Sequence, residues 1–414
     1  MGVGSGRVSA APGGHSVVPR PVRGLSLVSL LNDFSSEMVY PLLPAFVTRV
    51  LGGGAVTLGA LDGAADLTAA ALRWVSGRLA DRPGWSRRLI VGGYGLAVLV
   101  RPLVAITSAA WQVIGLRVLD RLGKGLRSPA RDALIAKLTP AEARGRAFGF
   151  NRGADHLGAV AGSLAAWLLL TSQTEVRGVI IASAVPGVLA LAVLWRVFRQ
   201  IDPQVVLSVP ETDESAAASD RQDRAFWVPI LALTLLTVAR LPETLLLLRL
   251  QDLGLAVAIV PLAWAGLHIV RTLAAYPGGW LSDRIGPRFT VAAAGLVFAA
   301  VLFLLSRDLT ALAAGLVFLV LGLVAGLAEG GERAVVAWLA PRRTGRAFGS
   351  AQAVAGVAAL PAGVAFGLLY QSRGGAAALL ASAAVTTVAA VTWLLVARMQ
   401  TPDSLTVGSA GDAV

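Results

Sequence analysis

Twelve apolar stretches follow one another along the chain and restrict its fold more than any other feature of the sequence. Each is close to the ~20 apolar residues that a helix needs to cross the hydrocarbon core of a bilayer. Strands are excluded because an open strand edge would leave backbone N–H and C=O groups unpaired in lipid. The sequence therefore predicts an all-α polytopic membrane protein with twelve transmembrane helices. These begin near Gly24, Val56, Arg88, Trp111, Arg146, Arg177, Phe226, Leu255, Arg288, Leu309, Arg346 and Gly375.

Charge supports this interpretation and indicates the orientation. Only 14% of the 414 residues are charged, and the net charge is +12, whereas a soluble domain has roughly 25% charged residues. In a soluble protein such an excess would suggest nucleic-acid binding, but in membrane proteins Arg and Lys collect in cytoplasmic loops. The loops after the second and fourth stretches carry Arg82, Arg87, Arg88, Lys137 and Arg144. We therefore expect a multi-pass plasma (inner) membrane protein with both termini cytoplasmic and no nucleic-acid partner.

The sequence contains no signature of an integral membrane enzyme. It has no cysteine, which excludes disulfides, thiolate metal sites and a cysteine nucleophile. It also lacks the H-E-x-x-H, G-x-S-x-G and phosphate-binding-loop motifs. We expect no catalytic residue, no metal and no cofactor.

A polar segment divides the chain into two halves of similar length. Residues 199–225 contain six acidic side chains separated mainly by small and polar residues, a composition typical of a solvated linker. The predicted organisation is a cytoplasmic tail, a six-helix bundle, a cytoplasmic linker, a second six-helix bundle and a second tail. Their bounds are 1–23, 24–198, 199–225, 226–398 and 399–414.

The two halves repeat each other in sequence. A Gly-x-x-x-Asp-Arg-x-Gly pattern follows the second apolar stretch and recurs after the eighth, so that Asp81 corresponds to Asp283 at an offset of 202. A Gly-Arg-Ala-Phe-Gly segment opens the fifth stretch at Gly145 and the eleventh at Gly345. Two matches at nearly one offset indicate a duplicated six-helix unit. Parallel repeats of this kind occur in transporters, in which the substrate path lies between the halves.

The duplicated pattern resembles the loop signature of the major facilitator superfamily, and the resemblance extends over Gly24–Arg398. It implies the two-bundle fold of that family and secondary transport by alternating access. It also implies a cytoplasmic gate in which the signature Asp pairs with basic groups, although ordinary turn roles would explain the same residues. The sequence departs from the family pattern in two places. Arg87 and Arg88 follow the loop motif two positions later than in the family, and Arg121 stands where family members often have Gly. The gate residues are Gly77, Asp81, Arg82, Gly84, Arg88, Gly279, Asp283, Arg284 and Gly286.

The fourth stretch places several charges on one side of a helix. At about 100° per residue, the side chains from Arg117 to Lys124 that carry charge fall in one arc, and apolar side chains occupy the opposite side. Charged groups within a membrane helix face protein or water rather than lipid. We therefore expect Arg117, Arg121 and Lys124 to line a cavity. The charges that follow Lys124 fit equally well at the cytoplasmic end of the helix.

Several other spans carry pairs of charged residues three or four positions apart, a spacing that places both members on one helix face. Arg240 and Glu243 are such a pair in the seventh stretch. Buried charges of opposite sign persist when they pair, so we expect part of this set to form ion pairs rather than to bind solute. The residues predicted to serve proton coupling or to line the cavity are Asp33, Glu37, Asp62, Asp66, Arg101, Arg117, Arg121, Lys124, Arg152, Asp155, His156, Arg240, Glu243, His268, Arg271 and Glu329.

Proton coupling requires a group that changes its protonation state at the working pH. Glu37 and Asp33 are the first candidates, because they share a face of the first stretch. His156 has an ordinary pKa near neutrality, although a packing role explains a single intramembrane His equally well. We expect proton-coupled secondary transport of a small polar or charged solute, and the many basic side chains favour an anionic or polar group on it.

The fifth stretch favours export over import. Its Gly149, Gly158 and Gly162, followed by Ser163, resemble the glycine frame of the antiporter branch of the family, with Ser in place of Pro. Small residues allow close helix packing, which a chain rich in Gly and Ala also shows for general reasons. The alternatives are a non-coupled facilitator and a membrane sensor or assembly factor on a transporter scaffold. The expected partners are a small-molecule solute, H+ and the lipid bilayer, and we expect a monomer.

Overall fold

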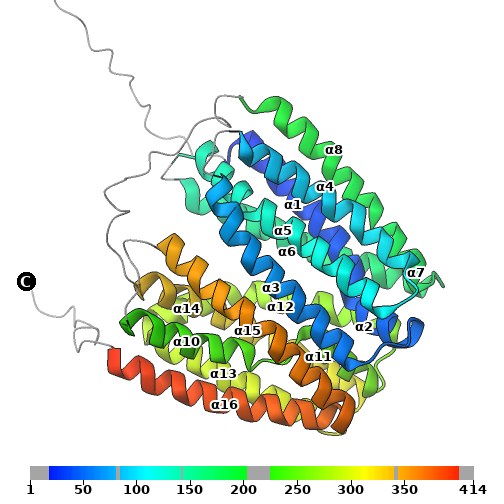
Figure 1. Cartoon of the computed structure of the whole chain (residues 1–414), viewed down its shortest axis with the longest axis vertical. Helices are drawn as coiled ribbons and strands as arrows, with labels where there is room; N and C mark the ends of the chain where they lie inside the picture. The colour runs from blue at the N-terminus through cyan, green and yellow to red at the C-terminus, as the bar shows by residue number, and fades with distance from the viewer. Residues whose placement is uncertain (1–17, 81–83, 141–142, 203–223, 340–343, 401–414) are drawn as a thin grey trace, which may run out of the picture.

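The computed structural model describes residues 18–80, 84–140, 143–202, 224–339 and 344–400. Within these residues every regular element is a helix, and the helices form twelve rods (Figure 1). The first six rods are α1 (Arg20–Val39) with η1 (Tyr40–Leu42), α2 (Leu43–Ala45) and η2 (Phe46–Val50); α3 (Ala55–Ala80); α4 (Trp85–Leu103) with η3 (Val104–Ile106); α5 (Ala110–Leu138); α6 (Arg144–Thr171); and α7 (Val176–Ala182) with α8 (Ala184–Gln200). The last six are α10 (Arg224–Val238) with α11 (Glu243–Asp252); η6 (Val257–Ile259) with α12 (Val260–Ile285); α13 (Pro287–Leu305); α14 (Ala311–Leu339); α15 (Thr344–Arg373); and α16 (Gly375–Gln400). The predicted all-α fold is confirmed.

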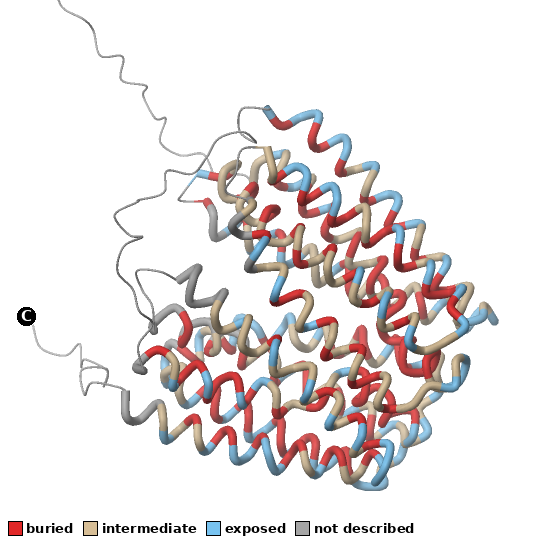
Figure 2. The backbone as a smooth tube through the Cα atoms, in the orientation of Figure 1, coloured by how far each residue is buried: buried red, intermediate tan, exposed pale blue. Residues whose placement is uncertain are grey.

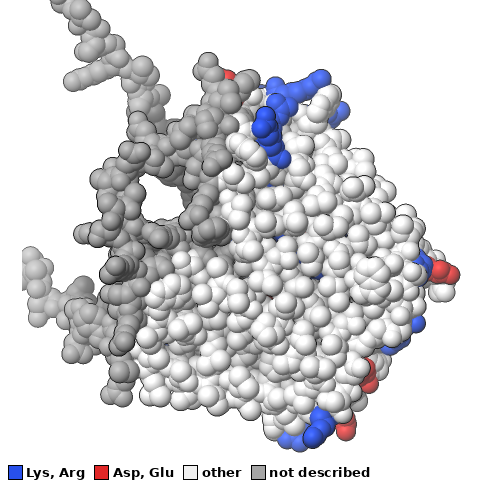
Figure 3. All heavy atoms as spheres, in the orientation of Figure 1, with Lys and Arg blue, Asp and Glu red and all other residues white. Residues whose placement is uncertain are grey.

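Ten helical segments of the described chain are long and apolar enough to cross a membrane. The other two rods, built on α1 and α5, do not reach this hydropathy because they carry many polar and charged side chains. On the face shown in Figure 3, the charged side chains gather at the ends of the helices and the surface between the ends is nearly uncharged. An uncharged belt is what a chain that crosses a bilayer presents to lipid.

The rods form two groups. In the first group α1 packs against α6 and α8, and α5 packs against α3 and α4. In the second group α14 packs against α12 and α13, and α13 packs against α16. Between the groups α3 lies along α15, and α6 lies along α12 (Figure 1). The predicted linker at 199–225 falls between the two groups, and most of it lies outside the described residues.

Proline accompanies a break in the first rod and in the seventh. Pro41 follows the end of α1 at Val39, and Pro242 lies between the end of α10 at Val238 and the start of α11 at Glu243. Proline has no backbone N–H and its ring clashes with the carbonyl four residues earlier, so a regular helix ends near it. The two prolines are 201 positions apart, close to the offset of the sequence repeat. Both groups thus begin with a discontinuous rod.

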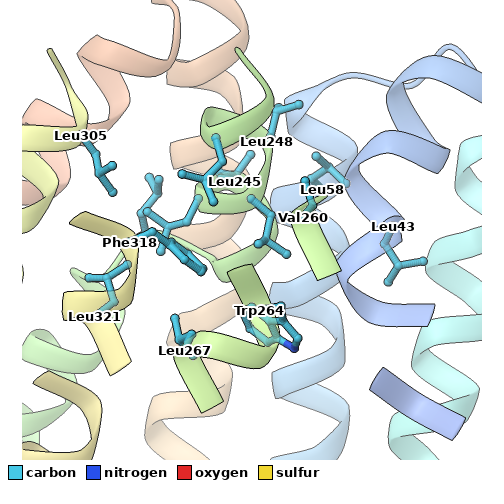
Figure 4. Packing of buried hydrophobic residues seen from close by; sticks show 14 of the residues in the cluster. Leu43, Leu58, Leu245, Leu248, Val260, Trp264, Leu267, Leu305, Phe318 and Leu321 are labelled. Carbon is cyan, nitrogen blue, oxygen red and sulfur yellow. The ribbon is translucent and has the colours of Figure 1, made fainter. Parts of the chain in front are cut away.

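Buried hydrophobic side chains show where the two groups adhere. A cluster at the end of the molecule where α3 begins and α11 ends, here called the loop-end cluster, contains side chains of both groups. Among its members are Leu43, Leu58, Leu245, Val260, Trp264 and Phe318 (Figure 4). At the opposite end, here called the linker end, the described clusters belong to one group each, around Ile90 in the first and Trp393 in the second. Along outer helices such as α16, buried and exposed residues alternate (Figure 2), as expected of helices with one face toward lipid.

The contact between α3 and α15 depends on glycine. A Cβ atom on Gly59 would lie 1.9 Å from the carbonyl oxygen of Gly363, and one on Gly363 would lie 2.3 Å from that of Gly59. Cβ atoms on Gly63, Gly356 and Gly367 would lie between 2.4 and 2.7 Å from atoms of the opposite helix. Helices approach this closely only where side chains are absent. The two groups are therefore in direct backbone contact along these helices.

Candidate substrate cavity

A cavity of about 560 Å³ lies between the two groups of helices, on the linker side of the loop-end cluster. Its volume is typical of a site for a small organic molecule. Side chains of both groups line it, which brings together many residues that the sequence places far apart. The predicted candidates that line it are Glu37, Asp62, Asp66, Arg117, Arg121, Lys124, Arg240, Glu243, His268 and Arg271.

Charged side chains of α3 and α5 form the wall that the first group contributes. On α3, Asp62 and Arg73 are eleven positions apart, which returns them to the same helix face after three turns. On α5, Arg117, Arg121 and Lys124 line the cavity together. The three bases of the charged arc therefore face the cavity, whereas Asp120, which belongs to the same arc, is absent from the lining.

The Asp62 carboxylate connects the two groups of helices. It accepts hydrogen bonds from the backbone N–H of Thr244 (3.1 Å), from the Thr244 hydroxyl (2.8 Å) and from the Tyr40 hydroxyl (3.2 Å). Thr244 is in the first turn of α11, where unpaired N–H groups and the helix dipole favour an anion. Asp62 thus binds the start of a helix that the break at Pro242 creates. We call these contacts the Asp62 bridge.

A second polar contact between the groups involves Glu37 on α1 and Trp264 on α12. The Trp264 indole Nε1 donates a hydrogen bond to Glu37 Oε2 at 2.8 Å. The Trp264 ring lies 5.3 Å from the ring of Tyr40 and 5.1 Å from that of His268, measured between centroids. Neither ring nitrogen of His268 has a hydrogen-bond partner among the described residues. A carboxylate, an indole and an imidazole therefore meet at the boundary between the groups.

Arg240 and Glu243 do not share a helix face, so that part of the sequence prediction is wrong. The cause is the break at Pro242: Arg240 lies between α10 and α11, whereas Glu243 starts α11. Arg240 instead pairs with Glu332 of α14 at 2.7 Å. Both residues of the predicted pair still line the cavity.

Arg101 lies away from the cavity, in a buried ion-pair network between α4 and α5. Its guanidinium is 2.9 Å from Asp120 Oδ1 and also donates to the backbone carbonyl of Asn32 at 2.8 Å. Arg117 approaches the same carboxylate at 3.5 Å and stacks on the ring of Tyr40. Asp120 is therefore shared by two arginines, as expected for buried charges that persist by pairing.

Four other described candidates are absent from the cavity lining, namely Asp33, Arg152, Asp155 and His156. Asp155 of α6 contacts Arg131 at 3.7 Å and Arg152 at 3.9 Å. Asp33 accepts a hydrogen bond from its neighbour Asn32. The ring of His156 lies 6.4 Å from that of His268, between centroids. The side chain of the last candidate, Glu329, lies outside the described residues.

The structure describes part of the predicted cytoplasmic gate. Gly84 precedes α4 with φ of 74°, and Gly286 precedes α13 with φ of 86°, a backbone region that favours glycine. The guanidinium groups of Arg88 and Arg284 lie over the rings of Trp85 and Trp280, respectively. The remaining gate glycine of the second half, Gly279, is part of α12. The described part of the chain does not include Asp81, Arg82, the side chain of Asp283 or the surroundings of Gly77.

Tyr40, Trp264 and Gln352 also line the cavity. They are neutral, and in the sequence nothing separates them from other neutral side chains of membrane helices. Their roles follow from the helix breaks and from the contact of α3 with α15, which bring them against charged residues of the other group.

Two related helix bundles with an ionisable cavity between them define the class of this protein as a membrane transporter. The sequence matches the Major Facilitator Superfamily over residues 25–269 and 241–412. The chain belongs to the major facilitator superfamily, a family of multi-pass membrane proteins that transport small-molecule solutes.

Relatives cover most of the chain. An uncharacterized protein of Mycobacterium tuberculosis is 32% identical over 372 residues, covering 85% of this chain and 87% of the relative. An uncharacterized MFS-type transporter of Methanocaldococcus jannaschii is 27% identical over 355 residues, covering 84% and 87%. The multidrug resistance protein MdtH of Photorhabdus laumondii is 33% identical over 168 residues, which is 40% of each chain.

Solved structures show the same fold. A bacterial homologue of the human lysosomal transporter Spinster, in an inward-facing and unoccupied conformation, has a TM-score of 0.74 and 17% identity, covering 93% of this chain and 98% of that one. A POT family transporter in complex with 5-aminolevulinic acid has a TM-score of 0.78 and 12% identity, covering 94% and 98%.

Proposed function

We propose that this protein is a proton-coupled secondary transporter of a small polar or charged solute in the plasma (inner) membrane, working as a monomer by alternating access. The observation that carries this proposal is the cavity at the boundary of the two groups, lined by carboxylates and bases from both. Ionisable groups within a membrane are costly and therefore mark solute or proton pathways. No nucleic acid takes part, because the excess of basic residues belongs to loops and to the cavity.

Glu37 is the residue that we assign to proton coupling. Its carboxylate accepts the Trp264 indole N–H across the boundary between the groups. A hydrogen bond to a charged acceptor is stronger than one to a neutral acceptor, so protonation of Glu37 weakens this contact. Proton binding is thereby linked to the separation of the two groups, which is the movement that alternating access requires.

The loop-end cluster and the Asp62 bridge lie between the cavity and the loop end, which supports assigning this arrangement to a state closed at that end. The predicted gate motifs act at the linker end, where we place both termini and the linker on the cytoplasmic side. In the opposite state the gate residues Asp81 and Asp283 would pair with basic groups and close that end. A protein that alternates between these states needs no catalytic residue, metal or cofactor.

Two observations favour export. Gly158 and Gly162 of α6, which resemble the antiporter glycine frame, lie against the backbone of α1, since Cβ atoms on them would come within 2.2 Å of the carbonyl oxygens of Leu30 and Phe34. The relative MdtH is named a multidrug resistance protein, over 40% of this chain. We therefore propose exchange of the solute for protons, with the solute leaving the cell.

The test is transport by the purified protein in vesicles with an imposed pH gradient and a broad solute panel. The Glu37→Gln variant is expected to lose proton-driven accumulation but to retain exchange of solute for solute, because exchange needs no net proton release. Glu175→Gln, a matched change at an exposed residue, should leave both activities intact.

Each alternative function gives a different result in the same assay. Solute transport without proton flux would identify a non-coupled facilitator. No solute-dependent flux across the panel would favour a sensor or an assembly factor. Proton dependence that survives Glu37→Gln would remove Glu37 from the coupling mechanism while leaving transport established.

A further inference from the structure

Three basic side chains of the cavity have no carboxylate partner in the part of the chain that the structure describes. Arg73 donates a hydrogen bond to the neutral side chain of Gln352 at 2.8 Å. Among the described residues, the side chains of Arg121 and Lys124 form no ion pair and no hydrogen bond. All three are half-buried in the cavity lining, and we call them the basic wall.

Among the described residues, no carboxylate of the cavity forms an ion pair with the basic wall. Glu37 is bonded to Trp264, and Asp62 is bonded to Thr244. Glu243 accepts a hydrogen bond from the Tyr40 hydroxyl, and Asp66 has no hydrogen bond or ion pair among the described residues. Buried charges without partners are unfavourable unless a ligand or water compensates them. The basic wall therefore presents cationic N–H donors without ion-pair partners to whatever occupies the cavity.

The second group of helices adds aromatic rings to the lining, beside its ionisable residues Arg240, Glu243, His268 and Arg271. The rings are those of Trp264, Phe298 and Phe318, and we call these three rings the aromatic wall. They belong to α12, α13 and α14, respectively, and all three also belong to the loop-end cluster. A ligand that contacts both walls has to combine an apolar body with a charged group, because burying apolar surface against such rings is favourable.

We propose that the solute is an amphipathic organic anion whose acidic group binds the basic wall and whose apolar body lies against the aromatic wall. Carboxylate and phosphate oxygens match the N–H donors of arginine and lysine, and hydrogen bonds between such charged groups are the strong ones. The cavity of about 560 Å³ accommodates a molecule of this kind. This inference rests on the proposed transport function and adds the class of solute to it.

Four probes separate the contributions of charge and apolar body. They are 2-naphthoate, 2-naphthamide and 2-naphthylmethylammonium, which share one ring system, and acetate, which carries the charge without the body. Binding to the purified protein is measured as the rise in melting temperature with probe concentration, since a ligand that binds the folded state stabilises it. We expect 2-naphthoate to bind at least tenfold more tightly than each of the other three.

Variants of the basic wall locate the site. Arg121→Gln and Lys124→Gln are each expected to weaken 2-naphthoate binding at least tenfold and to leave 2-naphthamide binding unchanged. Arg49→Gln, which removes one positive charge from an exposed position outside the cavity, should change neither. A variant that fails to fold would lose binding of both probes and is recognised by that result.

Two outcomes would overturn the inference. The first is that 2-naphthoate binds no more tightly than 2-naphthamide or 2-naphthylmethylammonium. The second is that Arg121→Gln and Lys124→Gln leave the binding of 2-naphthoate unchanged. Proton-driven transport of a cationic or neutral solute would reject the solute class but keep the proposed function. Anion binding at the basic wall without any solute-dependent flux would keep the site and reject transport.

Discussion

At the scale of single residues, the charged side chains of α5 divide between two tasks. Arg121 and Lys124 face the cavity without carboxylate partners among the described residues, whereas Asp120 is held between Arg101 and Arg117. The Asp120 side chain is 5% exposed. Neighbouring positions on one helix thus line the cavity or form a buried ion pair, and the difference lies in which neighbour each side chain meets.

Asp120→Asn is therefore expected to reduce stability rather than to change solute selectivity. Removing one member of a buried ion pair leaves the partner charge uncompensated, at a cost of about 3–5 kcal/mol. Thermal unfolding of the purified protein should show a clearly lower melting temperature. Asp308→Asn, at a fully exposed carboxylate 4.0 Å from Arg249, should leave the melting temperature nearly unchanged. Equal effects of the two substitutions would contradict a structural role for Asp120.

At the scale of elements, the contact of α3 with α15 sets how closely the two groups approach. The atoms nearest to a Cβ on Gly59 or Gly363 belong to the opposite backbone, which has no flexible side chain that could move aside. Either Gly→Ala substitution should force the helices apart, at about 1–3 kcal/mol, and lower the melting temperature. Gly92→Ala on α4 is the matched control, because a Cβ there meets nothing within 4 Å. The contact would be less tight than described if Gly363→Ala and Gly92→Ala unfolded at the same temperature.

The helices also show which structural features can be predicted from the sequence and why others cannot. Apolar length predicts the helices, and the helical period predicts that Arg117, Arg121 and Lys124 share a cavity face, because both signals are local. The pairing of Arg101 with Asp120 depends on how α4 and α5 are rotated relative to each other. A pattern within one helix cannot predict that rotation. The seventh rod breaks at Pro242, and periodicity across that point wrongly joins Arg240 to Glu243. Neutral cavity residues such as Trp264 carry no sequence signal at all.

At the scale of the whole molecule, the described hydrophobic cluster that joins the two groups lies at the loop end. The loop-end cluster contains side chains of both groups, while the described clusters at the linker end belong to one group each. Hydrophobic contact is non-directional, so a polar contact is needed to fix how the two groups of helices align. The Asp62 bridge meets this need, since one carboxylate of the first group accepts both Thr244 donors of the second.

The Asp62 bridge predicts that the loop end opens when this carboxylate is removed. Hydrogen bonds to charged groups contribute about 1.5–3 kcal/mol each, and a shift of about 1.4 kcal/mol changes an equilibrium tenfold. The chain has no cysteine, so a single Leu43→Cys in the loop-end cluster can be labelled uniquely with a maleimide in lipid nanodiscs. Adding Asp62→Ala should raise its labelling rate at least tenfold, whereas Asp308→Ala, at an exposed acid of the same end, should not.

Local opening must be distinguished from general unfolding of the Asp62→Ala protein. Ile90→Cys, in the cluster of the first group at the linker end, is fully buried and has no part in the Asp62 bridge. Its labelling should stay slow in the Asp62→Ala background, because each group retains its own core there. Faster labelling at both positions would mean that Asp62 supports the fold as a whole. Unchanged labelling at Leu43→Cys would mean that the loop-end cluster alone holds the two groups together.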